Sequence, residues 1–211
     1  MDNSASGEAE YNKIEYKNVE IRDSRIQLKE FNSCTFIKCN FNGTNFQRCR
    51  FRDCTFVACD LSLVSLKDTS FSNSRFAESK LLGINWTQSD WAAGSLIARP
   101  VNFQTCVLNS STFMGLNLEK VILNHCVLHD VSFEDANLSY ADCVGSDFED
   151  ARFSHTNLTG TDFREAKNYN IDPVMNTLKK TKFSMPEAMS LLYTLNILLD
   201  EPMPERPLIM L

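Results

Sequence analysis

The dominant feature of this sequence is an apolar residue at every fifth position. From Tyr16 to Leu96 all 17 such positions are apolar, and after a shift of two residues a further 13 follow from Phe103 to Phe163. Fourteen of the 15 phenylalanines lie on this register, although only 43% of the chain is apolar. A period kept over this length means that one small structural unit is repeated along the chain.

A second restricted position lies two residues before each apolar centre and holds small side chains. Seven of the eight cysteines occupy it, and the eighth, Cys143, is itself a centre. Neither an α-helix nor a flat strand can keep every fifth side chain on one face. A coil with sides of five residues can, because four sides close a square turn. Thirty quintets then make about 7.5 turns, or a rod about 36 Å long at roughly 4.8 Å per stacked strand.

The runs Ala136-Asn137-Leu138, Ala141-Asp142 and Thr161-Asp162-Phe163 resemble the A(D/N)LXX unit of the pentapeptide-repeat family. The resemblance covers about residues 16–166. It implies a right-handed quadrilateral β-helix, a handedness that the spacing alone does not give. We therefore expect an all-β solenoid over residues 16–166, preceded by a disordered segment, residues 1–15.

The repeat is interrupted once, by the frame shift at residues 97–102. Pro100 lies in this segment and cannot donate a ladder hydrogen bond, which favours a bulge or a small loop. Just before it, Trp86 and Trp91 are unusually large centres. They indicate either a distorted coil with both indoles packed near a corner and their N–H groups bonded, or an exposed protein-binding site.

Residues 167–211 are expected to form a C-terminal α-helical cap and tail. Asp172-Pro173 predicts a short helix over Val174–Leu178. Ser184 and Glu187 have the spacing of a capping box, which predicts a second helix that ends near Leu195. Its apolar face can lie on the last coil or meet a second copy of the chain, and we expect a homodimer. That face consists of Ala188, Leu191, Leu192 and Leu195.

Catalytic, metal and cofactor chemistry has little support in the sequence. There is no phosphate loop and no nucleophile elbow. His125, Cys126 and His129 would converge on a helix but diverge on this coil, so we expect no metal and no cofactor. Because we see neither a signal peptide nor a membrane span, we expect a cytoplasmic, non-enzymatic protein with reduced, buried thiols.

Charge divides the rod into two halves. Residues 11–102 hold 13 bases and 9 acids, whereas residues 103–166 hold 3 bases and 10 acids. A period of 20 residues stacks Asp130 over Asp150 and Asp142 over Asp162. The predicted partner-binding acids are Asp130, Glu134, Asp135, Asp142, Asp147, Glu149, Asp150 and Asp162. Such a row of carboxylates either keeps the protein soluble or imitates the phosphates of DNA.

The C-terminal half, with its terminal helix, is similar to the Qnr-type quinolone-resistance and microcin-immunity branch of the family. That resemblance implies a homodimer that mimics DNA and binds a type II topoisomerase, DNA gyrase or topoisomerase IV, without contacting nucleic acid or membrane. Two features depart from the branch: the N-terminal half is basic, and the interruption adds two residues where longer loops are common. The alternative is a scaffold that binds another protein through Trp86 and Trp91.

Overall fold

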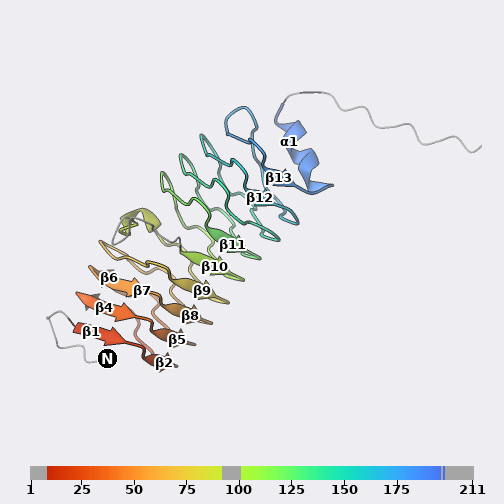
Figure 1. The fold of residues 1–211 in the computed structure, drawn as a ribbon. Coiled ribbons are helices and arrows are strands. Elements are labelled where there is room, and N and C mark those ends of the chain that lie inside the picture. Colours follow the sequence, from red (N-terminus) through yellow and green to blue (C-terminus); the bar gives the residue numbers. More distant parts are fainter. Residues whose placement is uncertain (1–8, 92–100, 196, 198–211) are drawn as a thin grey trace, which may run out of the picture.

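A computed structural model describes residues 9–91, 101–195 and 197. They form a parallel β-solenoid whose turns stack into a rod, with a short helical segment at the C-terminal end (Figure 1). The strands are β1 (Ala9–Asn12), β2 (Glu15–Lys17), β3 (Arg25–Gln27), β4 (Lys29–Asn32), β5 (Thr35–Ile37), β6 (Asn45–Gln47), β7 (Arg50–Arg52), β8 (Thr55–Val57), β9 (Arg75–Ala77), β10 (Asn102–Gln104), β11 (Ile122–Asn124), β12 (Asp162–Phe163) and β13 (Lys182–Phe183). The helices are the 3-10 helices η1 (Trp86–Gln88) and η2 (Glu187–Met189) and the α-helix α1 (Ser190–Tyr193).

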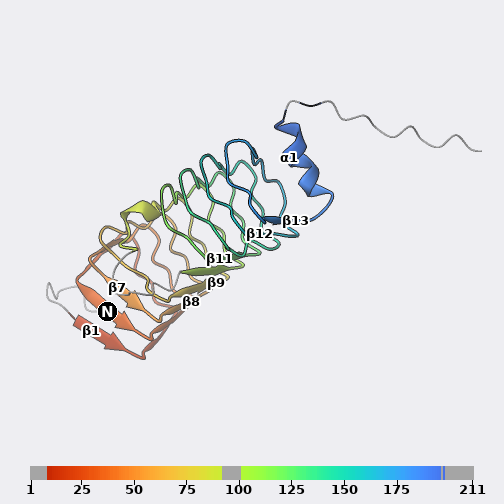
Figure 2. The same cartoon turned by 45° about the horizontal axis from the view of Figure 1, so that its top comes forward.

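The ladder register defines four sides, which the turned view shows as a square coil (Figure 2). Side 1 is the sheet of order β11-β10-β9-β8-β5-β2 and continues through β12 and β13. Side 2 is a row of single bridges from Glu20 to Lys167, side 3 contains β3 and β6, and side 4 contains β1, β4 and β7. Partners such as Tyr16 and Phe36 are 20 residues apart, which confirms the predicted quadrilateral β-helix.

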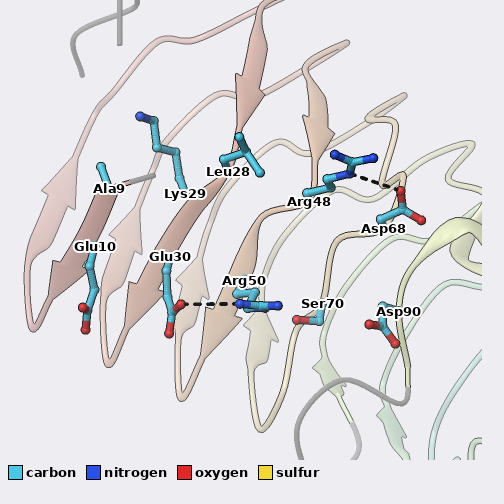
Figure 3. Close-up of a pocket in the computed structure, with 10 residues that line it drawn as sticks. All are labelled: Ala9, Glu10, Leu28, Lys29, Glu30, Arg48, Arg50, Asp68, Ser70 and Asp90. Atoms are coloured by element: carbon cyan, nitrogen blue, oxygen red, sulfur yellow. Dashed lines mark ion pairs between the residues drawn. The ribbon is translucent and has the colours of Figure 1, made fainter. Parts of the chain in front are cut away.

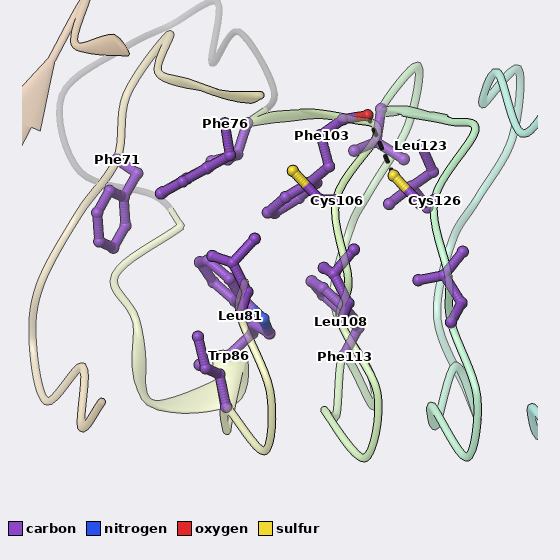
Figure 4. Packing of buried hydrophobic residues seen from close by; sticks show 14 of the residues in the cluster. Phe71, Phe76, Leu81, Trp86, Phe103, Cys106, Leu108, Phe113, Leu123 and Cys126 are labelled. Atoms are coloured by element: carbon purple, nitrogen blue, oxygen red, sulfur yellow. Dashed lines mark hydrogen bonds between the residues drawn. The ribbon is translucent and has the colours of Figure 1, made fainter. Parts of the chain in front are cut away.

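Inward-facing rings form stacks that run along the rod. On side 1, Phe36 and Phe56 are parallel with ring centroids 4.7 Å apart. On side 3, Trp86 takes the place of a phenylalanine and stacks on Phe113 at 5.6 Å, as the packing view shows (Figure 4). Burial of these rings removes apolar surface from water, and their stacked and edge-on contacts add to that gain.

The small residues before the centres are inward and buried, as predicted. All eight cysteines are at most 2% exposed. The Sγ atom of Cys54 donates to the Phe31 carbonyl oxygen at 3.3 Å, and Cys59 does the same to Phe36 at 3.3 Å. Burial raises the pKa of Cys54 and of Cys59 to about 12, so both stay protonated at neutral pH.

Most sides end in a corner residue with a positive φ, two positions after the centre. The values are 56° at Asp130, 57° at Asp150 and 69° at Gly160. This left-handed conformation turns the chain onto the next side and points the corner side chain outward. Glycine adopts it without strain, and aspartate and asparagine tolerate it better than most residues.

The expectation that residues 1–15 are disordered is wrong for residues 9–15. Strand β1 pairs in parallel with β4, and Tyr11 stacks on Phe31 with a centroid distance of 5.0 Å. Tyr11 lies five residues before Tyr16 and is therefore a further centre, which the acidic sequence around it obscured. Residues 1–8 lie outside the described residues.

The interruption is larger than the frame shift indicates. Ladder partners are 20 residues apart elsewhere, but Arg75 pairs with Asn102, which is 27 residues later, so seven residues are inserted rather than two. A pattern with a period of five cannot distinguish an insertion of two from one of seven. Residues 97–100 of the predicted shift lie outside the described residues, whereas Val101 is buried and Asn102 begins β10.

The solenoid also continues beyond Ala166, contrary to the predicted boundary. Lys167 bridges to Asp147, Thr177 to Asn157, and β13 pairs with β12. No helix forms over 174–178, because this stretch follows the ladder of the previous turn. Asp172 nevertheless caps a turn there: its Oδ1 atom accepts from the backbone N–H of Val174 at 2.7 Å.

Candidate partner-binding surfaces

Six of the eight predicted partner-binding acids lie together on sides 2 and 3 and their corners. We call this group the acidic face; it consists of Asp130, Glu134, Asp135, Asp147, Glu149 and Asp150. Asp147 is a rung of side 2, where it bridges to Val127. The backbone N–H of Asp130 donates to the Glu149 carbonyl oxygen at 2.9 Å, which places the Asp130 corner over the Asp150 corner as predicted.

Basic side chains lie within the acidic face, and Arg152 lowers its net charge. The Nη1 atom of Arg152 is 2.5 Å from Oδ1 of Asp130, and its Nε atom is 3.9 Å from Oε2 of Glu134. His155 lies 3.6 Å from Asp135. These pairs are largely exposed, so each contributes at most about 1 kcal/mol to folding.

Asp147 is bound more tightly than the other members of the acidic face. Its side chain is 15% exposed and lies 3.2 Å from Nε2 of His129 and 3.3 Å from Nζ of Lys167. It also accepts a hydrogen bond from Nδ2 of Asn168 at 2.8 Å. Burial raises the pKa of Asp147, but the hydrogen bond from Asn168 and the nearby His129 and Lys167 side chains outweigh this effect and hold the pKa below its ordinary value. Asp147 thus joins side 2 to the last turn.

Asp142 and Asp162 do not belong to the acidic face, because both lie on side 1. They bridge to each other as predicted. Asp162 lies 2.8 Å from Nη2 of Arg164 and 3.2 Å from Nζ of Lys182. The hydrogen bonds from Arg164 lead the causes that lower the pKa of Asp162 to about 2, so this carboxylate is fully ionised and paired.

The two tryptophans pack inward, as the distorted-coil interpretation predicts. Trp86 lies in η1 and is 1% exposed, so it cannot be an exposed anchor for a partner. Trp91 is partly buried against the core, and its Nε1–H donates to the Trp86 carbonyl oxygen at 2.8 Å. The Nε1–H of Trp86 has no acceptor among the described residues, so only one of the two expected indole bonds forms.

The predicted capping box does not form, because Ser184 and Glu187 bond the coil instead. Ser184 Oγ accepts from the backbone N–H of Glu165 at 2.9 Å, and Glu187 Oε1 accepts from that of Asn168 at 2.6 Å. The helical segment is also shorter than expected. Both bonds satisfy backbone donors of the last full turn, so the segment closes the end of the rod.

The apolar face of the terminal segment is only partly covered. Ala188, Leu191 and Leu192 are half-buried, and Leu191 packs against the solenoid core. Leu195 is 37% exposed and Tyr193 72% exposed. The segment therefore lies partly on its own rod and still presents apolar surface to solvent.

Metal-ligating side chains do not converge within the described ranges. His125 is exposed and Cys126 is buried, as their alternation on the coil predicts. No group of three or more histidine, cysteine or acidic side chains in this part of the chain could hold a metal ion. None of the described helices is long and apolar enough to cross a membrane.

A groove on side 4 of the N-terminal half was missed by the sequence reasoning. It has a volume of about 540 Å³ and runs from Glu10 to Asp90, with Lys29, Arg48 and Arg50 between them (Figure 3). One signal was present in the sequence. Lys29 occupies the position two residues before the centre Phe31, where small residues prevail.

The comparisons with known proteins agree with this geometry. The model described as pentapeptide repeat region matches residues 29–99 and 97–163. The chain belongs to the pentapeptide-repeat family. No curated protein sequence matches it.

Among solved structures, this pentapeptide-repeat protein is similar in fold to QnrB1, described as a plasmid-mediated fluoroquinolone resistance protein. A trypsin-treated variant of QnrB1 has a TM-score of 0.70 at 18% identity, covering 92% of this chain and 100% of the other. Full-length QnrB1 has a TM-score of 0.52 at 19% identity, covering 90% and 100%. At this identity the likeness concerns the fold alone.

Proposed function

We propose that this protein is a cytoplasmic, non-enzymatic interaction protein whose acidic face binds the basic DNA-binding groove of a type II topoisomerase. The observation that carries the proposal is the stacking of Asp130 over Asp150 beside Asp147 and Glu149, which puts four carboxylates on two successive turns. Turns of a β-solenoid are roughly 4.8 Å apart, so the carboxylates form a stiff array of negative charge. Such an array suits a groove lined by lysine and arginine.

The likeness to QnrB1 supports the choice of partner. QnrB1 is a fluoroquinolone resistance protein, and its fold covers 92% of this chain. The Qnr-type resemblance seen in the sequence implies DNA gyrase or topoisomerase IV as the partner. Protection of that enzyme from quinolones is the corresponding cellular role.

A charge-removal variant tests the proposal. Asp130→Asn, Glu149→Gln and Asp150→Asn together remove three charges and spare Asp147, which the last turn needs. At about 0.5 kcal/mol per exposed charge, affinity for purified gyrase should fall about tenfold at low salt, and the difference should shrink at high salt. Glu20→Gln, Glu78→Gln and Glu119→Gln together are the matched control, since these exposed acids lie outside the acidic face.

A second variant should act in the opposite direction. Arg152 neutralises Asp130 and Glu134 from within the acidic face. Arg152→Gln should therefore strengthen binding to gyrase by severalfold. Equal affinities for the wild type, the triple variant and its control would refute the topoisomerase proposal and favour a scaffold for another protein partner, reached through a surface other than Trp86.

We also propose a homodimer joined through the terminal segment. Tyr193 is 72% and Leu195 37% exposed, so the segment that carries the predicted face presents apolar side chains to solvent. Tyr193→Glu should convert a dimer into a monomer in analytical ultracentrifugation at micromolar concentration, without loss of thermal stability. Truncation after Ser184 is a poorer test, because it also removes the Glu187 bond to Asn168. A wild-type monomer would contradict the proposal.

A further inference from the structure

The groove on side 4 presents its charges in a fixed order along the rod. Glu10 pairs with Glu30, Glu30 with Arg50, and Arg50 with Ser70, so these residues form one column. Asp90 continues the column at the far end, where its backbone N–H bonds the Thr69 carbonyl oxygen. The two ends of the groove are therefore acidic, and the cations lie between them (Figure 3).

The two arginines in the middle of the groove can donate further hydrogen bonds. The Nε atom of Arg48 lies 3.9 Å from Asp68, and the Nη1 atom of Arg50 lies 3.9 Å from Glu30, both longer than a hydrogen bond. Glu30 is instead bonded by Arg52. The side chains of Arg48 and Arg50 are 66% and 58% exposed, so both guanidinium groups are accessible from the groove.

Lys29 is a departure from the repeat, because it places a long charged side chain at a position that elsewhere holds small residues. The equivalent residue on the next turn is Cys49, and its ladder partner on the preceding turn is Ala9. Lys29 is only 9% exposed, yet it lines the groove with its charged chain.

We propose that this groove binds an extended segment of a partner protein that carries an acidic residue flanked by basic residues. The central carboxylate would meet Lys29, Arg48 and Arg50, and the flanking cations would meet Glu10 and Asp90. From Glu10 to Asp90 the column makes four ladder steps, or about 19 Å, which about six residues of extended chain span. The volume of about 540 Å³ is ordinary for a binding site.

The acidic ends of the groove argue against a polyanion. Four carboxylates line it, from Glu10, Glu30, Asp68 and Asp90, against three cations. A nucleic-acid backbone would meet repulsion at both ends, whereas a segment with alternating charge is complementary throughout. The groove lies on side 4 of the N-terminal half and shares no residue with the acidic face, so this proposal does not depend on topoisomerase binding.

Amide chemical shifts of the full-length protein test the proposal. The probe is a peptide, acetyl-Lys-Gly-Gly-Asp-Gly-Gly-Lys-amide, and the comparison is its charge inverse, acetyl-Glu-Gly-Gly-Lys-Gly-Gly-Glu-amide. The first peptide should shift amides at Glu10, Glu30, Arg50 and Asp90, and should bind at least tenfold more tightly than the inverse. Arg48→Gln with Arg50→Gln should abolish these shifts, and Arg22→Gln with Arg25→Gln, on sides 2 and 3, should leave them unchanged.

Three results would overturn the proposal. The first is no shift at millimolar peptide, and the second is equal binding of the two peptides, which would mean that the charge order is not recognised. The third is that inorganic phosphate competes with the peptide and binds as tightly, which would make the groove a simple anion site. Gyrase binding by the Arg48 and Arg50 double variant should stay at the wild-type level, so failure here is distinguishable from failure of the proposed function.

Discussion

Replacing Phe51 with alanine should remove the middle ring of the side 4 stack. The Phe51 centroid lies 4.9 Å from those of both Phe31 and Phe71, and the rings are nearly parallel. Phe46 and Phe56 contact it edge-on at 5.6 and 5.5 Å. Because Phe51 is 2% exposed and held on all sides, the neighbouring rings have little freedom to fill the space left behind.

The expected loss of unfolding free energy follows from this packing. Truncation of a buried phenylalanine to alanine costs about 3–5 kcal/mol, and aromatic pairs contribute about 0.5–1.5 kcal/mol beyond their burial. With two parallel partners lost, Phe51→Ala belongs near the upper end, at about 4–5 kcal/mol. Phe51→Leu keeps most of the volume and should cost about 1.5 kcal/mol.

Urea denaturation measures both variants. Unfolding can be followed by circular dichroism and by the fluorescence of Trp86, which is buried in the same core. The loss of unfolding free energy should be much larger for Phe51→Ala than for Phe51→Leu. If Phe51→Ala loses less than 1 kcal/mol, or if the two variants lose equal amounts, the inward register of side 4 is wrong.

Two further predictions concern single residues. Asp162→Asn should lower the unfolding free energy by about 2 kcal/mol at pH 7, because hydrogen bonds from Arg164 lower the pKa of Asp162 from 3.8 to about 2. This stabilisation is present above about pH 4 and is lost as the pH falls through 2. The difference in stability between the variant and the wild type should therefore disappear when unfolding is measured at decreasing pH. Gly160→Ala should lower the thermal stability more than Gly115→Ala. Both glycines have a φ near 69°, but a Cβ at Gly160 would lie 2.7 Å from the Tyr140 ring, whereas a Cβ at Gly115 meets nothing within 4 Å. Thermal melts should show this difference, and it should vanish when Tyr140 is also replaced by alanine; a difference that persists in the Tyr140→Ala background would refute the steric explanation.

The fold was predictable because each quintet carries its own information. A large centre and a small preceding residue specify one side of the coil, and repetition fixes the register over most of the chain. The predicted boundaries of the solenoid were wrong at both ends, where fewer of the residues follow the five-residue pattern. Tyr11 continues it within an acidic stretch, and Phe183 continues it exactly one turn after Phe163, with the irregular residues around Asn168 and Pro173 between them.

The candidate sites were predictable only to the level of the backbone register. Spacing placed Asp130 over Asp150 and Asp142 over Asp162, and the structure agrees. Spacing did not reveal that Arg152 reaches back to Asp130, since that contact depends on the length and direction of a side chain. The groove on side 4 likewise required the columns of neighbouring turns to be assembled before its charge order could be seen.

In this rod, whether a charged side chain is paired depends on the residues at the same position of the adjacent turns rather than on its neighbours in the sequence. Like charges on adjacent rungs repel each other and destabilise a sheet unless cations intervene. The column of Asp142 and Asp162 has its cations in Lys182 and Arg164, so its charge serves folding.

The column of Asp130 and Asp150 has Arg152, which lies against Asp130, and no described cation pairs with Asp150. The repulsion on that corner is therefore relieved at one rung only. A lysine or arginine supplied by a partner would gain most at Asp150, where it replaces water rather than an internal guanidinium group. Under the proposed function, Asp150 is therefore the carboxylate of this column that a cation of the partner can reach without displacing Arg152.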